Sequence, residues 1–257
     1  MGIGTHLGIV AQSGGGVLFD KYSWTFDGTD EFFVNQNTFD SIPEDRNYGS
    51  LSTVKWSTSL WIKPDSLPGN RYIYYTTDSS NALVTYLLVK STGQLQAFIG
   101  GSSSNYTRFN NFSLSTGNWY NVVVTYNGAL NRYLKLRIFV NGTISSGGSN
   151  FFAANNFEST EIRLGNNYDE NAEFPGHINE FAVWKNHTLG QSEVDSIYNS
   201  GVANDLTTLS TPPTNFFRSE TAVYGGTNWE MTDVMGTGKI LQSTNMDTSN
   251  KTTDVPS

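Results

Sequence analysis

The stretch Gly117-Asn-Trp-Tyr-Asn-Val-Val-Val-Thr-Tyr-Asn-Gly128, with Leu134-Lys-Leu-Arg-Ile-Phe-Val-Asn-Gly142 shortly after it, decides the fold class of this 257-residue chain. Both segments end in Asn-Gly, the residue pair that best tolerates the positive φ angles of a tight hairpin turn. In the second segment every second residue from 134 to 140 is apolar, and Lys135 and Arg137 lie between them. This alternation is typical of an antiparallel strand with one buried face. The two segments therefore predict an all-β fold.

Strand-like segments of this kind recur along most of the chain. They occupy residues 22–26, 31–34, 57–62, 72–76, 84–89, 94–99, 120–126, 134–140, 161–164 and 178–184. Turn pairs such as Asp27-Gly28, Pro68-Gly69 and Thr92-Gly93 separate several of them. Many short strands joined by polar turns predict a jelly-roll sandwich of two antiparallel sheets.

One short helix is predicted over residues 191–200. Val194, Ile197 and Tyr198 have the spacing of a single apolar helix face. Gly201 is placed to end this helix in a left-handed conformation.

The composition suggests three parts in the chain. Residues 1–16 are rich in glycine and predict a flexible N-terminal arm. Residues 17–210 contain the strands of the sandwich. Residues 211–257 begin with Thr-Pro-Pro-Thr and contain few aliphatic side chains. Because such a short segment rarely forms its own core, we expect it to pack on the sandwich or on a neighbouring subunit.

The charge and the missing cysteines exclude several classes of function. The formal net charge is −8, and the 15 Lys and Arg residues are scattered, so no nucleic-acid partner is expected. The chain has no cysteine, which excludes thiolate metal sites and thiol catalysis. No apolar run approaches the ~18 residues of a membrane span, and the first residues do not form a signal peptide. We therefore expect neither a membrane partner nor secretion by a signal peptide.

Several motifs, met in order, resemble one superfamily. They include Leu60-Trp-Ile-Lys-Pro64, the segment 117–142 quoted above, and Gly176-His-Ile-Asn-Glu-Phe-Ala-Val-Trp184. Over roughly residues 20–205 the chain is similar to the laminin G-like, or concanavalin A-like, jelly-roll superfamily. The resemblance implies the sandwich fold, which in this superfamily serves lectins, adhesion modules, hydrolases and virion parts. Many relatives have Asp where this chain has Asn179, which weakens a calcium site at that position.

The C-terminal segment carries a second resemblance. Residues 217–233, read with Asn245-Met246 and Asp254-Val-Pro256, resemble segments that follow such jelly rolls in structural proteins of tailed bacteriophages. This resemblance implies a virion protein on a capsid or tail surface, made in the host cytoplasm without a signal peptide. Its expected partners are other virion proteins or copies of itself, with a trimer favoured, and a host surface glycan.

The carboxylates do not form the catalytic pattern of the related glucanases. Those enzymes carry alternating Glu and Asp residues along one strand, so that acid and nucleophile face the sugar from one side. The nearest pattern here is Glu193-Val-Asp195, which lies on the predicted helix without a third carboxylate. We expect no enzymatic activity.

Two loops carry enough oxygen ligands to suggest calcium. Asp27 and Asp30 flank a predicted turn, and Asp169, Glu170 and Glu173 crowd the loop before the last long strand. Ca²⁺ takes 6–8 oxygen ligands, and carboxylates are the commonest of them. The alternatives are a turn-forming Asp27 and a solvated acidic loop.

Aromatic residues in loops suggest a glycan site. Tyr106, Phe109 and Tyr168 are the main candidates, with Phe151 and Phe152 beside them, among many asparagines. Aromatic rings with neighbouring amides suit sugars, and they suit protein interfaces equally well.

The sequence thus predicts a non-enzymatic phage virion surface protein, either a capsid decoration or a fibre-type component. Its lectin-like jelly roll would serve display, assembly or contact with host glycans. A stand-alone, calcium-dependent carbohydrate-binding or adhesion module is the first alternative. A polysaccharide hydrolase with unrecognised catalytic carboxylates is the second.

Overall fold

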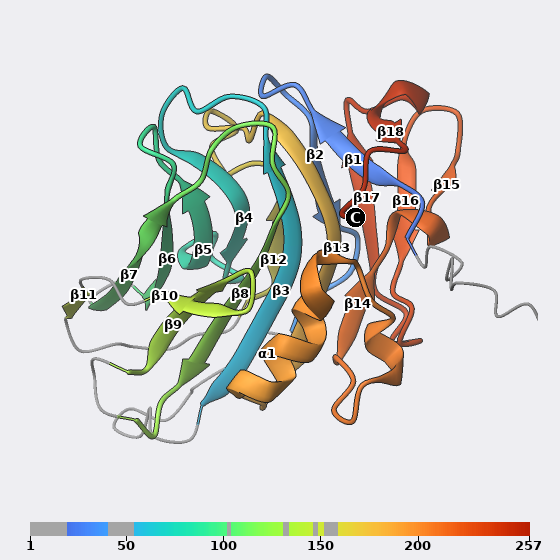
Figure 1. Cartoon of the computed structure of the whole chain (residues 1–257). Coiled ribbons are helices and arrows are strands. Elements are labelled where there is room, and N and C mark those ends of the chain that lie inside the picture. Colours follow the sequence, from blue (N-terminus) through green and yellow to red (C-terminus); the bar gives the residue numbers. More distant parts are fainter. Residues whose placement is uncertain (1–19, 41–53, 102–103, 131–133, 146–148, 152–158) are drawn as a thin grey trace, which may run out of the picture.

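Two antiparallel sheets face each other across an apolar core in the computed structural model, which describes residues 20–40, 54–101, 104–130, 134–145, 149–151 and 159–257 (Figure 1). The predicted jelly-roll sandwich is therefore confirmed. The predicted N-terminal arm, residues 1–16, lies outside the described residues.

The first sheet has eight strands. Their order across the sheet is β10 (Thr143–Ser145), β9 (Leu136–Val140), β8 (Tyr120–Asn127), β3 (Lys55–Pro64), β13 (Gly176–Lys185), β1 (Ser23–Phe26) and β18 (Lys251–Thr252), and β14 (Asn215–Phe217) also pairs with β13.

The second sheet has ten strands. Their order is β11 (Ser149–Phe151), β7 (Ser104–Ser113), β6 (Gln94–Gly101), β5 (Leu83–Val89), β4 (Arg71–Thr77), β12 (Glu161–Leu164), β2 (Phe32–Asn35), β17 (Ile240–Thr244), β16 (Trp229–Thr232) and β15 (Val223–Tyr224).

Alternation along each strand determines which side chains fill the core. In β8, Val122, Val124 and Tyr126 point between the sheets, whereas Val123 points to the outer side. All four are fully buried. The outer side needs its own apolar cover, and a helix supplies it.

Helix α1 (Gln191–Tyr198) covers the outer face of the eight-stranded sheet (Figure 1). Its residues Val194 and Ile197 belong to one apolar cluster with Val123 and Trp184 of that sheet. The helix ends earlier than Gly201, because Asn199 already adopts a left-handed conformation with φ of 45°. Short 3₁₀ turns follow at Asn199–Gly201, Leu206–Thr208, Ser219–Thr221 and Thr248–Asn250. In the described part of the chain no helix has the length and apolarity needed to cross a membrane.

The two predicted Asn-Gly turns differ in the structure. Asn141 and Gly142 have φ of 50° and 76° and join β9 to β10 in a tight hairpin, as predicted. Asn127 ends β8 without a positive φ, and its side chain accepts a hydrogen bond from the Ala129 N–H at 3.0 Å. Strand β9 then begins only at Leu136, so the prediction that Leu134 faces the core was wrong, and Leu134 is 46% exposed.

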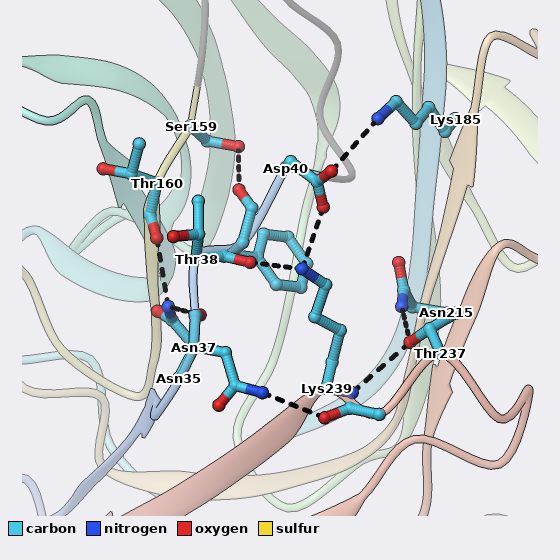
Figure 2. A network of polar contacts seen from close by, with 12 residues as sticks. Asn35, Asn37, Thr38, Asp40, Ser159, Thr160, Lys185, Asn215, Thr237 and Lys239 are labelled. Carbon is cyan, nitrogen blue, oxygen red and sulfur yellow. Dashed lines mark hydrogen bonds and ion pairs between the residues drawn. The ribbon is translucent and has the colours of Figure 1, made fainter.

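Residues beyond 211 add strands to both sheets. Strand β14 pairs with β13, β17 with β2, and β18 with β1. Figure 2 shows the polar contacts between the β16–β17 turn and the segment after β2. Asn37 donates to the Gly238 carbonyl at 3.0 Å, and the Lys239 ammonium lies 3.0 Å from a carboxylate oxygen of Asp40. These C-terminal strands are therefore built into the chain's own sandwich.

Candidate functional site

A row of aromatic side chains crosses the outer face of the ten-stranded sheet. Phe98 of β6 lies directly opposite Tyr86 of β5, and Tyr86 lies opposite Tyr75 of β4. Tyr75 in turn lies opposite Arg163 of β12. We call this part of the sheet, with Tyr72 beside the row, the open face.

The sequence brings these rings to one side through alternation and one irregularity. Ile73 and Tyr74 both point into the core, because the β4–β5 register shifts between Tyr72 and Tyr74. Such a bulge inserts one residue and changes the side to which later residues point. Tyr72 and Tyr75 therefore share the outer side, although their spacing of three breaks the period of two.

The rings form an ordered stack. The ring centroids of Tyr86 and Phe98 are 4.8 Å apart, with an angle of 5° between the planes. Tyr75 and Tyr86 are also nearly parallel, at 6.5 Å and 8°. Tyr72 meets both tyrosines edge-on, at 5.3 Å and 5.2 Å. These are the favoured geometries of aromatic pairs, so each ring limits the movement of the next.

The described apolar neighbours of this stack all belong to the sheet itself. The apolar cluster that contains Tyr86 and Phe98 draws all its members from β4, β5 and β6. Tyr86 and Phe98 are only 9% and 8% exposed, whereas Tyr72 and Tyr75 remain partly exposed. The accessible surface of the stack therefore belongs mainly to Tyr72 and Tyr75.

Hydroxyl and amide groups surround the rings. The Gln96 amide donates a hydrogen bond to the Tyr86 hydroxyl at 2.6 Å. Burial, Tyr72 and Asp169 together raise the pKa of Tyr75 to about 12. Burial and Asp169 raise the pKa of Tyr72 as well. Both hydroxyls therefore stay neutral at physiological pH and can donate and accept hydrogen bonds.

Arg163 lies at the end of the row, and two carboxylates compensate its charge. The guanidinium of Arg163 lies 2.7 Å from a carboxylate oxygen of Glu161 and 2.7 Å from one of Glu170. It also lies over the rings of Phe32 and Tyr168, at 4.9 Å and 5.1 Å from their centroids. Two of the sequence-predicted residues, Tyr168 and Glu170, thus meet at the open face.

The other predicted aromatics lie on the neighbouring strand. In the β6–β7 ladder, Phe109 is paired with Gln96 and Tyr106 with Ile99. The side chains of Tyr106 and Phe109 are outside the described part of the structure. Phe151 belongs to β11, and Phe152 lies outside the described residues.

The first predicted calcium loop uses its carboxylates within the protein. A carboxylate oxygen of Asp27 accepts the Thr29 N–H at 2.7 Å, the contact of a turn-forming aspartate. Asp30 accepts a hydrogen bond from the Asn245 amide at 3.1 Å.

The second predicted calcium loop spreads its carboxylates apart. Asp169 acts on the tyrosines of the open face, Glu170 pairs with Arg163, and Glu173 is buried and accepts from the Asn166 amide at 3.2 Å. Within the described ranges, no group of three or more His, Cys, Asp or Glu side chains is arranged to hold a metal ion.

Glu193 and Asp195, the nearest match in the sequence to a catalytic acidic pair, make contacts within α1 and at its N-terminus. The Glu193 carboxylate accepts the Gly190 N–H at 2.8 Å and lies 2.9 Å from the His187 ring nitrogen. Asp195 accepts a hydrogen bond from Gln191 at 2.7 Å. Both carboxylates thus stabilise the first turns of α1.

Sequence reasoning missed Tyr72, Tyr75, Tyr86 and Phe98 as site residues. All four lie in segments that the sequence correctly predicted as strands, where large aromatic residues usually belong to the core. In the run from Val84 to Val89, Tyr86 is the one aromatic residue, and it occupies an outward position. An aromatic residue at an outward position of each of three adjacent strands is the signal that could have indicated this face.

Comparisons with known proteins agree with the fold. A family described as the concanavalin A-like lectin/glucanases superfamily matches residues 22–195. A SAP-like pentraxin from Limulus polyphemus, solved as a heptamer, is 20% identical, with 69% of this chain and 82% of that chain covered and a TM-score of 0.51. A candidate carbohydrate-binding protein from Bacteroides ovatus is 14% identical, with 92% and 61% covered and a TM-score of 0.60. No curated protein matches the chain significantly by sequence.

Proposed function

The chain belongs to the concanavalin A-like lectin/glucanase superfamily, and on that premise we propose that it is a non-enzymatic carbohydrate-binding protein whose open face holds a neutral glycan. One observation carries this proposal. Phe98, Tyr86, Tyr75 and Arg163 form a continuous row across four adjacent strands, and the described apolar neighbours of its rings come from the sheet itself.

The chemistry of the row suits a sugar ring. A pyranose presents one face of C–H groups and a rim of hydroxyls, so it binds where an aromatic surface lies beside fixed donors and acceptors. Tyr72 and Tyr75 supply partly exposed ring surface, and their neutral hydroxyls supply both kinds of polar contact. Ligand sites of this kind combine aromatic walls with a few well-placed polar groups.

The electrostatics favour a glycan without charge. Arg163 already has two carboxylate partners, Glu161 and Glu170, so its charge is compensated within the protein. Asp169 adds negative charge beside Tyr72 and Tyr75. A carboxylated or sulfated sugar would meet this negative charge beside an arginine that is already paired.

A panel of immobilised glycans tests the proposal. The wild-type chain is expected to bind at least one neutral glycan, and Tyr75→Ala is expected to weaken that binding by about tenfold or more, since a stacking contact is lost. Tyr22→Ala is the matched control, because Tyr22 is an exposed tyrosine outside the open face. Equal affinity of Tyr75→Ala and wild type would contradict the proposed site.

The finer proposal places this module on a tailed-phage virion, as a capsid decoration or fibre-type component. It is supported by the resemblance of residues 217–233, with Asn245-Met246 and Asp254-Val-Pro256, to segments of phage structural proteins. Since β14, β17 and β18 pair with the chain's own strands, contacts with other virion proteins or with further copies would use other surfaces. Native mass spectrometry with and without a chelator tests the expected homo-oligomer, with a trimer favoured, and the expected calcium together. A monomer whose mass is unchanged by the chelator would contradict both the expected homo-oligomer and the expected bound calcium.

A further inference from the structure

A groove lies beside the C-terminal end of α1, on the side of the sandwich opposite the open face. It consists of two hollows, of about 370 Å³ and about 490 Å³. The hollows meet at Asn141, Tyr198 and Ser200, which line both of them. We call this the helix-end groove.

Aromatic rings form part of its wall. The Trp61 and Tyr198 rings are 6.1 Å apart, tilted by 33°. Trp119 lines the same hollow as both. The Trp119 indole donates a hydrogen bond to Asp254 at 2.9 Å, and the Lys63 ammonium lies 5.9 Å from its centroid. The wall is therefore preorganised, and a ligand would not have to order Trp119 on binding.

The rest of the lining is polar. Asn118 and Asn141 supply amides to one hollow, and Gln191 and Asp195 supply an amide and a carboxylate to the other. Neither hollow has Lys or Arg among its described lining residues. The groove therefore offers hydrogen bonds and the carboxylate of Asp195, and the nearby Lys63 ammonium is already paired with Asp254.

A buried polar atom without a partner lies beside the strand position of Trp61, although its residue lines neither hollow. Asn121 is directly opposite Trp61 in the β3–β8 ladder, and its N–H donates to the side-chain oxygen of Asn141 at 2.9 Å. The side-chain oxygen of Asn121 has no hydrogen-bond partner among the described residues, although Asn121 is only 1% exposed. Buried polar atoms normally have a partner, which an ordered water can provide.

The backbone at the rim is strained. Asn199, Ser200 and Gly201 have φ of 45°, 60° and 102°, so three successive residues are left-handed. Only glycine adopts this region without cost, and such strain often occurs at functional positions. Here it occurs directly after Tyr198 and includes Ser200, which lines both hollows.

We propose that the helix-end groove is a second saccharide site, for a neutral pyranose unit. The partly exposed rings of Trp119 and Tyr198 would contact the C–H face of the sugar, and the buried Trp61 ring would hold Tyr198 in place. The amides and Asp195 would bind its hydroxyls. The groove site is independent of the open face, because the two sheets and the core lie between them.

With both sites occupied, one chain holds two saccharides on opposite faces. This consequence rests on the proposed function of the open face, whereas the groove site does not. A single chain would then link two glycan-bearing surfaces without forming an oligomer.

Nuclear magnetic resonance of the indole N–H groups tests the groove in the full chain. Glucose, galactose, mannose and N-acetylglucosamine are titrated, with glucuronate as the acidic comparison. We expect at least one neutral sugar to shift the Trp61 or Trp119 signals, and glucuronate to leave them unchanged. No shift with any neutral sugar, or a shift with glucuronate alone, would overturn the proposal.

Variants at the groove separate it from the open face. Asp195→Ala removes an exposed carboxylate of α1 together with its hydrogen bond from Gln191, and it is expected to weaken this binding about tenfold while the sandwich stays folded. Tyr198→Ala is expected to abolish the binding. Ser192→Ala, which lines a different hollow, is the control. Tyr75→Ala is expected to leave the indole shifts unchanged while it removes binding at the open face. Indole shifts that persist in Asp195→Ala and Tyr198→Ala would refute the groove site, whatever happens at the open face.

Discussion

The rings of Tyr86 and Phe98 lie parallel across the β5–β6 ladder, with centroids 4.8 Å apart and both side chains more than nine-tenths buried. A pair this well buried cannot itself offer much surface to a ligand. Its role is to fix the position of Tyr75, which stacks on Tyr86 from the next strand. The open face therefore has a rigid aromatic base and a partly exposed edge.

Substitutions at Tyr86 separate its ring from its hydroxyl. Tyr86→Phe loses the hydrogen bond from Gln96 and is expected to lower the free energy of unfolding by about 1 kcal/mol, with glycan binding retained. Tyr86→Ala removes the base of the stack and is expected to cost about 3 kcal/mol and to weaken binding. Denaturant unfolding measures the first effect and the glycan panel the second. Full binding by Tyr86→Ala would show that the stack does not position the site.

Two glycines with the same φ of 76° form a matched pair for the fold. A Cβ at Gly93 would lie 2.2 Å from the Leu114 carbonyl oxygen, whereas a Cβ at Gly117 would have no neighbour within 4 Å. Gly117→Ala is expected to cost about 1–2 kcal/mol, the strain of a left-handed alanine alone. Gly93→Ala is expected to cost about 4 kcal/mol or more, because the backbone must also move. Equal midpoints of thermal unfolding for the two variants would contradict the close approach of Gly93 to Leu114.

The buried carboxyl groups of Asp20 and Glu180 predict a dependence of stability on pH. Burial, with the neighbouring Glu220 carboxylate, raises the pKa of Asp20 from 3.8 to about 8, against opposing effects of Asn179 and Arg218. Burial and Asp20 also raise the pKa of Glu180. Between pH 4 and pH 8, about the range from the unfolded to the folded pKa of Asp20, the folded state binds more protons than the unfolded state. The free energy of unfolding therefore falls as the pH rises from about 4 to about 8.

Asp20→Asn keeps the shape of the side chain and replaces the titratable carboxyl group with an amide that does not titrate. We expect the variant to be more stable than wild type at pH 8, by on the order of 2 kcal/mol, and to lose less stability between pH 5 and pH 8. Denaturant unfolding at several pH values measures the difference. Parallel stability curves for wild type and Asp20→Asn would refute a raised pKa.

Two lysines that share one carboxylate differ in burial (Figure 2). The Lys239 side chain is 18% exposed and lies 3.0 Å from Asp40, whereas Lys185 is 35% exposed and lies 3.5 Å from it. Lys239 also donates to the Thr38 carbonyl. Lys239→Met is expected to cost about 1 kcal/mol and Lys185→Met about 0.3 kcal/mol in the free energy of unfolding. The reverse order would mean that the C-terminal hairpin is not attached through Lys239.

The sequence predicts the sandwich well because alternation is a local signal. Val122 and Val124 point inward and Val123 outward, as a period of two requires. Alternation fails at Tyr72–Tyr75, where a bulge brings residues three apart to one side. The pairing of Tyr75 with Arg163 joins distant parts of the chain, and no local pattern indicates it. Tyr168 and Glu170 were predicted as separate candidates, for a sugar and for calcium, and their common partner Arg163 was missed.

Hydroxyl-radical footprinting of the full chain, with and without the neutral glycan that binds best in the panel, tests the central claim most directly. The bound glycan is expected to protect Tyr72 and Tyr75 from oxidation and to leave Tyr22 unchanged. Unchanged oxidation of Tyr72 and Tyr75 at saturating glycan would contradict a binding site on the open face.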